Sequence, residues 1–411
     1  MQQPAARPSR PHARPARQKS AAAGPRIFYK SPGPVSGGLL ATLLVVLAFG
    51  LIMLFSASYA TAFYKFGDSY HYIRSQAGYA VLGLAAMWLV SYVDYQWLRR
   101  FAWPLYLATL ALLVVVLFMP PINNVRRWIN VKYLPTVQVS EIAKFAIILL
   151  LACLFQQNQK RMRSFQQGIL LPGLLLVPML VLLYLEPHNS AMILMCCITA
   201  TLMFVGGANL VWFALGGSAA VGGVGLILLT RAGYVQERLA GWLDPFSDVL
   251  DSTMQTAQGL YTIGSGGWLG VGLGNSTQKH MWLPEAQNDF IFAILGEELG
   301  FVGAVLCVGL FALLVIQGIL VAVNAPDRMG CLLAVGVMAQ IGFQFFFNVA
   351  VVTNTIPNTG ISLPFFSSGG TSLLLLLGEM GVVLSVSRAG NKQRAEEKAR
   401  QTEKNNTDKE G

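Results

Sequence analysis

Long apolar stretches constrain the fold of this chain more than any other feature of its sequence. An α-helix needs roughly 20 consecutive apolar residues to cross the hydrocarbon core of a bilayer. Ten stretches approach or exceed that length, at 38–60, 76–93, 101–120, 139–156, 168–185, 190–206, 210–230, 290–323, 330–352 and 370–387. The first is too long for the apolar region of a signal peptide, so we expect it to stay in the membrane. The sequence therefore predicts an all-α integral membrane protein with about ten transmembrane helices.

Composition agrees with this class and excludes others. Charged residues make up only 12% of the 411, about half of what soluble domains carry. We expect residues 1–36 to form a disordered basic cytoplasmic tail, 37–388 a polytopic membrane domain, and 389–411 a charged cytoplasmic tail. The net charge of +10 lies mostly in these tails, which suits an anionic membrane face and gives little support for nucleic-acid binding. All five cysteines lie in apolar stretches without metal-binding spacing, which disfavours a zinc site or a disulfide framework.

The distribution of Lys and Arg predicts the orientation. With both termini in the cytoplasm, 20 of the 29 basic residues lie inside and eight outside, in agreement with the positive-inside rule. The long loop at about 231–289 then faces outward. The outer basic residues are Lys65, Arg74, Arg126, Arg127, Lys132, Arg231, Arg238 and Lys279. Basic residues that depart from the rule need a role on that side, so the sequence places the function at the outer face.

The outer loop 231–289 contains a glycine-rich run and ends at an acidic residue. The run, G-S-G-G-W-L-G-V-G-L-G at 264–274, lacks the phosphate-loop pattern and predicts a backbone that approaches a ligand or another segment closely. Asp289 lies where the loop re-enters apolar sequence, so partial desolvation should raise its pKa and suit it to accept a proton. A carboxylate that caps a helix is the alternative, and the residues alone leave both open.

The eighth apolar stretch, 290–323, is too long for one straight span. It contains Glu297 and Glu298, and acidic residues within a membrane indicate a function by default. We expect its first part to lie in a cavity or to re-enter the membrane, because irregular or polar segments are tolerated at depth only inside protein.

A second basic loop carries Arg126 and Arg127, followed by Glu141 and Lys144 at the start of a span. Adjacent arginines can bind a diphosphate or a carboxylate bidentately, and we favour ligand binding over headgroup anchoring for them. Glu141 and Lys144 are three residues apart on one helix face, so we favour an internal ion pair for these two.

The last outer loop, 353–369, is polar and uncharged. Its hydroxyl groups, amides and exposed backbone suit a sugar or a pyrophosphate, although ordinary turn chemistry explains most of its residues equally well. Two isolated titratable residues stand elsewhere: Glu379 inside the tenth stretch, and His188 beside Glu186 at a short outer turn. For His188, a capping or hydrogen-bonding role is favoured over metal ligation.

Taken together, these motifs resemble the SEDS family of shape, elongation, division and sporulation proteins, which includes FtsW, RodA and SpoVE. The resemblance covers roughly residues 38–388. Its most specific parts are the glycine run, Q-K at 278–279, L-P-E at 283–285, D-F-I-F-A at 289–293, E-E-L-G at 297–300, and the Pro357 to Gly370 segment, with R-R-W-I at 126–129 and S-E-x-A-K at 140–144. The chain departs from the family at Q-V-S-E (138–141, usually Q-P-S-E), S-S-G-G (367–370, usually S-Y-G-G) and P-H-N-S (187–190, usually P-D-x-G). The 264–290 loop is closer to FtsW and SpoVE than to RodA.

The resemblance implies a peptidoglycan glycosyltransferase that polymerises lipid II at the outer face of the bacterial cytoplasmic membrane, in cell division or sporulation. It implies as partners a class B penicillin-binding protein and other division or sporulation proteins. Asp289 matches the family's catalytic aspartate. The candidate substrate-binding residues are Arg126, Arg127, Arg238, Gln278, Lys279, Glu285, Ser367, Gly369 and Gly370, and the supporting residues are Glu141, Lys144, Glu297, Glu298, Pro357 and Pro364. We expect no protein-bound metal site, although a divalent cation (Mg²⁺ or Mn²⁺) could assist the leaving pyrophosphate.

Two rival functions stay open at this point. The first is a lipid II flippase, favoured by the intramembrane charges, because buried ions can mark a translocation path. The second is a non-catalytic membrane scaffold of the division machinery, with the tails as docking segments.

Overall fold

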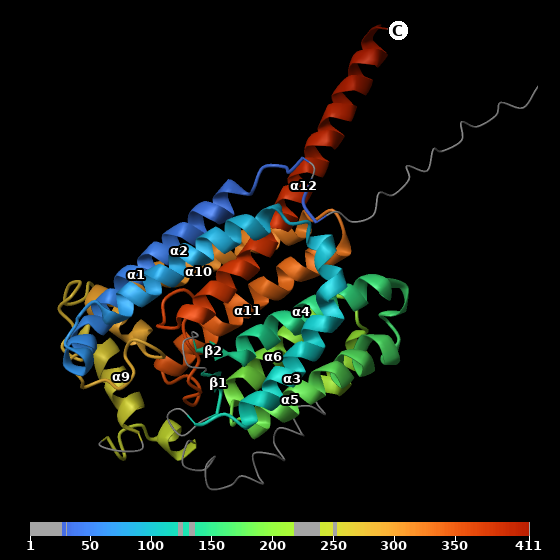
Figure 1. The fold of residues 1–411 in the computed structure, drawn as a ribbon. Coiled ribbons are helices and arrows are strands. Elements are labelled where there is room, and N and C mark those ends of the chain that lie inside the picture. The colour runs from blue at the N-terminus through green and yellow to red at the C-terminus, as the bar shows by residue number, and fades with distance from the viewer. Residues whose placement is uncertain are drawn as a thin grey trace, which may run out of the picture.

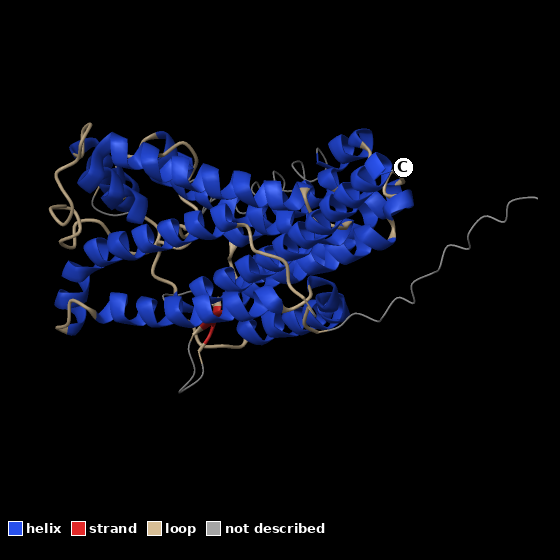
Figure 2. Cartoon of the chain, turned by 90° about the horizontal axis from the view of Figure 1, so that it is seen from above, coloured by secondary structure: helices blue, strands red, loops and turns tan. Residues whose placement is uncertain are grey.

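The computed structural model describes residues 27–29, 31–121, 126–130, 136–217, 239–249 and 253–410. Within these ranges the chain is a bundle of helices, and its only strands are the short pair β1 (Trp128–Ile129) and β2 (Val137–Gln138) (Figure 2). The two strands pair antiparallel, with Trp128 opposite Gln138.

Eight helical segments of the described chain are long and apolar enough to cross a membrane. The α-helices are α1 (Gly37–Phe66), α2 (His71–Tyr92), α3 (Ala102–Leu117), α4 (Val139–Gln157), α5 (Leu171–Leu185), α6 (Asn189–Val205), α9 (Met254–Ser265), α10 (Ile291–Val323), α11 (Arg328–Val352) and α12 (Gly370–Glu410). Short helical turns, η1 (Tyr95–Phe101), η2 (Gln159–Arg161) and η3 (Gln166–Leu170), join some of them. The prediction of an all-helical membrane protein is confirmed. The number of ten spans stays a prediction, because the stretch 210–230 is described only as far as residue 217.

Burial separates central from peripheral helices. Most side chains of α4 and α11 are buried inside the bundle. In contrast, α2, α3 and α5 expose large apolar side chains such as Val81, Leu107 and Leu174. A helix that is apolar on all sides is stable at the periphery only if lipid covers it, so these outer faces are the lipid-contacting surface. Figure 1 shows α1 and α2 side by side along one flank of the bundle, with α11 and α12 beneath them.

Helix α10 is broken, as its length and its two glutamates predicted. Gly300 has φ 66° and ψ −166°, and the segment before it is almost entirely buried. The break frees backbone groups that the glycine-rich run satisfies: the amides of Val271 and Gly272 donate to the carbonyls of Glu297 and Glu298, both at 3.0 Å. A Cβ atom on Gly270 would lie 2.2 Å from the Glu298 carbonyl oxygen, so only glycine allows this approach. The prediction that the glycine run approaches another segment closely is confirmed.

The first described residues contact the last helix. The Ser36 amide donates to Ser387 Oγ (2.9 Å), and Arg388 donates to the Gly33 carbonyl (3.1 Å). Residues 31–36, which we expected to belong to a disordered tail, therefore pack at the end of the bundle, whereas 1–26 lie outside the described residues. Helix α12 continues without interruption beyond the bundle to Glu410 (Figure 1), so the charged segment 389–410 is helical, and from Gln393 to Asp408 its side chains are exposed wherever the structure describes them.

Candidate functional site

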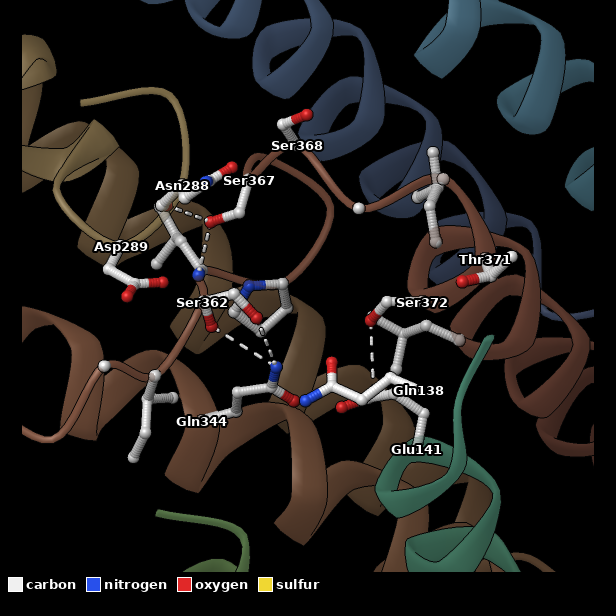
Figure 3. Close-up of a pocket in the computed structure, with 18 of the residues that line it drawn as sticks. Gln138, Glu141, Asn288, Asp289, Gln344, Ser362, Ser367, Ser368, Thr371 and Ser372 are labelled. Atoms are coloured by element: carbon white, nitrogen blue, oxygen red, sulfur yellow. Dashed lines mark hydrogen bonds between the residues drawn. The ribbon is translucent and has the colours of Figure 1, made fainter. Parts of the chain in front are cut away.

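A cavity of about 550 Å³ opens among segments that are distant in sequence. Its walls come from α2, the β1–β2 strands with the start of α4, the turn between α5 and α6, residues 285–289, and the loop from 360 into the first turns of α12. Figure 3 shows Asp289 and Asn288 on one side, Gln138, Glu141 and Ser372 on the other, and Gln344 with Ser362 between them. The second basic loop, the Asp289 segment and the last outer loop, which are separate in the sequence, thus form one site.

The backbone that carries Asp289 is held at three consecutive carbonyl groups. The Ser368 amide donates to the carbonyl of residue 287 (2.9 Å), Ser367 Oγ donates to that of Asn288 (2.6 Å), and Asn348 Nδ2 donates to that of Asp289 itself (2.8 Å). These donors come from α11 and the loop before α12. Because all three carbonyl groups are bonded, the backbone that carries the carboxyl group is held at the cavity wall.

The Asp289 side chain faces the cavity and does not cap a helix. Helix α10 begins at Ile291 with Phe290 in the capping position, so the capping alternative is wrong. Burial, together with the nearby Glu285 carboxylate, raises the pKa of the Asp289 carboxyl to about 6, and the positive charge of Arg127 opposes this rise. At neutral pH the group is therefore mostly ionised and more basic than an ordinary aspartate, as proton acceptance requires.

The two adjacent arginines have different positions. Arg127 lines the cavity, and its guanidinium donates to the carbonyl of Pro187. Arg126 is exposed, does not line the cavity, and donates to the Leu117 carbonyl (2.8 Å). The structure therefore brings Arg127, and not Arg126, to Asp289.

Glu141 and Lys144 form the ion pair that their spacing predicted, at the cavity wall. Lys144 Nζ lies 2.8 Å from Glu141 Oε2, and both residues are buried. Ser372 Oγ donates to the same carboxylate (3.1 Å), and Lys144 also contacts Gln344 Oε1 (3.4 Å). The pair joins α4 to α11 and α12 and places opposite charges beside the site.

Lys279 lies elsewhere, together with Glu297 and Glu298. Its Nζ atom is fully buried, 2.7 Å from Glu298 Oε1 and 2.6 Å from the Gly274 carbonyl oxygen. Ser56 on α1 donates to both oxygens of Glu298 (2.7 and 2.6 Å). Glu297 accepts from the backbone and hydroxyl of Thr277, both at 3.0 Å. These contacts join α1, the segment 274–279 and the first part of α10, and none of these groups lines the cavity.

Of the other predicted residues, some line the cavity and some do not. Glu285, Ser367, Gly369, Gly370 and Pro364 line the cavity, whereas Gln278 and Pro357 do not. Arg238 lies outside the described residues. Gly370 opens α12 where a Cβ atom would lie 2.1 Å from the ring of Tyr79.

Helix α2 contributes residues that sequence reasoning missed. Gln76 is buried, donates to the Ser367 carbonyl (3.1 Å) and accepts from the Gly369 amide (3.2 Å). It lies with Tyr72 and Tyr79 on one helix face that lines the cavity. The signal was available, because polar and aromatic residues at i, i+4 and i+7 share a face of an otherwise apolar helix.

Metal ligands are sparse in this region. The described residues contain no group of three or more His, Cys, Asp or Glu residues arranged to hold a metal ion. Asp289 and Glu285 both line the cavity, and Mg²⁺ is commonly held by one or two carboxylates together with substrate phosphates. Because Asp289 is the candidate proton acceptor, Glu285 would contact such an ion, which would supply charge neutralisation to a pyrophosphate.

Comparison with known proteins places the chain in a family. The family model for FtsW, RodA and SpoVE, described as "Cell cycle protein", matches residues 38–392. Stage V sporulation protein E of Bacillus subtilis (strain 168) is 41% identical over 351 residues, which cover 84% of this chain and 94% of that protein. A protein of Geobacter sp. (strain M18) named "Probable peptidoglycan glycosyltransferase FtsW" is 36% identical over 348 residues, covering 84% and 94%.

A solved structure agrees with this assignment. A chain from the work "Structural coordination of polymerization and crosslinking by a peptidoglycan synthase complex" superimposes with a TM-score of 0.71 at 29% identity, covering 87% of this chain and 98% of that one. The chain therefore belongs to the SEDS family, with FtsW, RodA and SpoVE, and is a multi-pass protein of the cytoplasmic membrane.

Proposed function

We propose that this chain is a peptidoglycan glycosyltransferase that polymerises lipid II at the outer face of the cytoplasmic membrane, in division or sporulation. The observation that carries the proposal is the Asp289 carboxylate, which lies on a hydrogen-bonded backbone in the wall of a polar cavity and has its pKa raised to about 6. Family membership and the names of the FtsW relatives support the choice of substrate.

The proposed reaction is a single displacement with inversion at the sugar carbon C1. The acceptor hydroxyl oxygen bonds to C1 while the bond from C1 to the pyrophosphate oxygen breaks, and the pyrophosphate leaves with the electron pair. Asp289 accepts the proton of the acceptor hydroxyl, as a base does in inverting glycosidases. The undecaprenyl chain of the donor stays in lipid while its headgroup enters the cavity.

Arg127 is the residue that we assign to the pyrophosphate. It lines the cavity, and its charge acts on Asp289, so an anion beside it would lie close to the base. A guanidinium binds two phosphate oxygens in a planar fork, which stabilises the charge that develops on the leaving group. Lys144 is less suited to this role because Glu141 already neutralises it.

The flippase alternative loses its main support. It depended on intramembrane charges, and each has a local partner: Glu141 with Lys144, Glu298 with Lys279, Glu297 with Thr277, and Glu379 with Gln340 (2.9 Å). Paired groups of this kind hold helices together and do not need a transported ion. A scaffold without catalysis does not require a shifted carboxyl group in a cavity.

The test is polymerisation by purified protein, reconstituted with its proposed partner, a class B penicillin-binding protein, and labelled lipid II. We expect the wild type to form glycan strands and Asp289→Asn to form none, with unchanged thermal unfolding. Full polymerisation by the variant would contradict the assignment of the base. An inactive wild type that moves labelled lipid II between leaflets would favour the flippase.

A further inference from the structure

Several buried polar atoms beside the cavity have no hydrogen-bond partner among the described residues. Glu186 is 1% exposed, and neither of its carboxyl oxygens has a hydrogen-bond partner. His188 is 6% exposed, and its Nδ1 atom has no hydrogen-bond partner. The hydroxyl groups of Ser140 and Ser190 are buried in the same condition. Unpartnered buried polar groups are costly and rare, so such a concentration points to bound water.

These groups lie on two neighbouring elements. Glu186 and His188 belong to the turn between α5 and α6, and Ser190 follows in the first turn of α6. Ser140 is in the first turn of α4, which packs against α6. Gln138 Nε2 lies 3.4 Å from His188 Nε2 and connects the two elements. His188 and Ser190 line the cavity, whereas Glu186 does not, so it reaches the cavity only through its neighbours.

Two cations face this turn. The positive charge of Arg127, which precedes β1, lowers the pKa of both Glu186 and His188. Lys144 on α4, which is ion-paired with Glu141, also lowers the pKa of His188. Burial nevertheless raises the pKa of the Glu186 carboxyl to about 8, with Arg127 opposing, so this carboxyl holds a proton at neutral pH. Burial lowers the pKa of His188 well below its usual range, and both cations act in the same direction, so its imidazole is neutral.

We propose that residues 186–190 form a hydrated acid site, in which Glu186 donates a proton through ordered water and the His188 imidazole to the departing pyrophosphate oxygen. The proposal rests on the glycosyl transfer proposed above. A buried water commonly bonds to about three otherwise unpartnered groups, and the carboxyl, the imidazole and the two hydroxyl groups supply them. A neutral imidazole has one donor and one acceptor nitrogen, so it can pass a proton on.

The protons balance over one turnover. The bond from C1 to the pyrophosphate oxygen breaks, that oxygen keeps the electron pair and takes the proton released by Glu186, and Asp289 takes the proton of the acceptor hydroxyl. Exchange with cavity water then removes the proton from Asp289 and returns one to Glu186. The charge of Arg127 lowers the pKa of Asp289, Glu186 and His188. The proposed base, Asp289, and the proposed acid, Glu186, therefore both lie near the residue that we assign to the pyrophosphate.

The first measurement does not depend on activity. Full-length wild type and Glu186→Gln in lipid nanodiscs are compared by infrared difference spectroscopy. We expect the difference between the wild-type and Glu186→Gln spectra to contain a protonated-carboxyl C=O band at pH 7, and this band to disappear as the pH passes about 8. A wild type without this band at pH 7 would overturn the proposal, whether or not the protein polymerises lipid II.

The second measurement is the pH profile of polymerisation. We expect the wild-type rate to fall above about pH 8, where Glu186 loses its proton. Removal of a general acid should make Glu186→Gln slower by about 10²-fold at pH 7 and should abolish this decrease at alkaline pH, called here the alkaline limb. Glu379→Gln makes the same change in a buried carboxyl that does not line the cavity, and should keep the limb. His188→Asn, a second variant in case Glu186→Gln does not fold, should keep the infrared band and lose rate. Wild-type rate and limb in folded Glu186→Gln would overturn the acid role, whereas an inactive wild type that retains the band would overturn only the proposed glycosyl transfer.

Discussion

Replacing Lys279 distinguishes a structural role from a substrate-binding role for this residue. In the structure its ammonium group is fully buried and lies 2.7 Å from Glu298, whose oxygens also accept from Ser56. Lys279→Met would leave the Glu298 carboxylate in the interior without its cation. Removing one partner of a buried pair typically costs about 3–5 kcal/mol. We expect a loss of stability of that size, because no water reaches either side chain.

The pair also predicts how the two changes combine. Glu298→Gln removes the buried negative charge and keeps an acceptor for Ser56, so the double variant Lys279→Met/Glu298→Gln should be more stable than the single lysine variant. We expect a coupling of about 1–3 kcal/mol, as for residues in direct contact. The assay is chemical unfolding of detergent-solubilised protein, and Lys65→Met, at an exposed position on α1, is the matched control.

Measurements of KM and of unfolding for Lys279→Met distinguish the two roles of this residue. If Lys279 instead bound the pyrophosphate, as one interpretation of the outer loop suggested, Lys279→Met would raise KM for lipid II and leave unfolding unchanged. A folded variant within about 0.5 kcal/mol of the wild type, the range of an ordinary surface substitution, would contradict the structural reasoning. Additive effects of the two changes would contradict it as well.

Three further predictions concern the cavity. The polymerisation rate should fall as the pH drops through about 6, because protonation of Asp289 removes the base; a pH–rate profile measures this, and a flat profile down to pH 5 would count against the assignment. Gly360→Ala should lower kcat, because Gly360 has φ +68° and a Cβ atom would lie 3.2 Å from Asp289 Oδ2, whereas Gly378→Ala meets no atom within 4 Å and should be neutral. Arg127→Ala should raise KM for lipid II by about tenfold or more, as loss of a charged hydrogen bond does, and the exposed Arg126→Ala should not; equal effects would return both to headgroup anchoring.

Features set by local sequence could be predicted. Hydropathy identified the helices because each apolar stretch must cover its own backbone in the membrane, whatever its neighbours are. The break in α10 followed from a stretch too long for one span with two acids inside it. The ion pair of Glu141 and Lys144 followed from helical spacing alone. In each case the sequence pattern that predicts the feature lies within one element.

Contacts between distant segments could not be predicted in this way. Nothing near Lys279 indicates that Ser56, on the first helix, completes the environment of its partner Glu298. Sequence reasoning grouped Lys279 with Asp289 because both lie in the outer loop 231–289, but one side chain is buried in the interior and the other lines the cavity. The face of α2 that carries Gln76 was visible in the sequence, but its two partners lie in the last loop, so the contact itself could not be predicted.

The separation of Arg126 from Arg127 depends on contacts with different segments. The pairing of Trp128 with Gln138 holds the chain after them against the start of α4, and both of these residues line the cavity. Arg127 lines the cavity as well and donates to the carbonyl of Pro187, in the turn that contains Glu186 and His188. Arg126 is exposed and donates to the Leu117 carbonyl at the end of α3. Because the acceptor of Arg127 lies 60 residues away in the sequence, two adjacent arginines do not indicate by themselves which of them reaches the site.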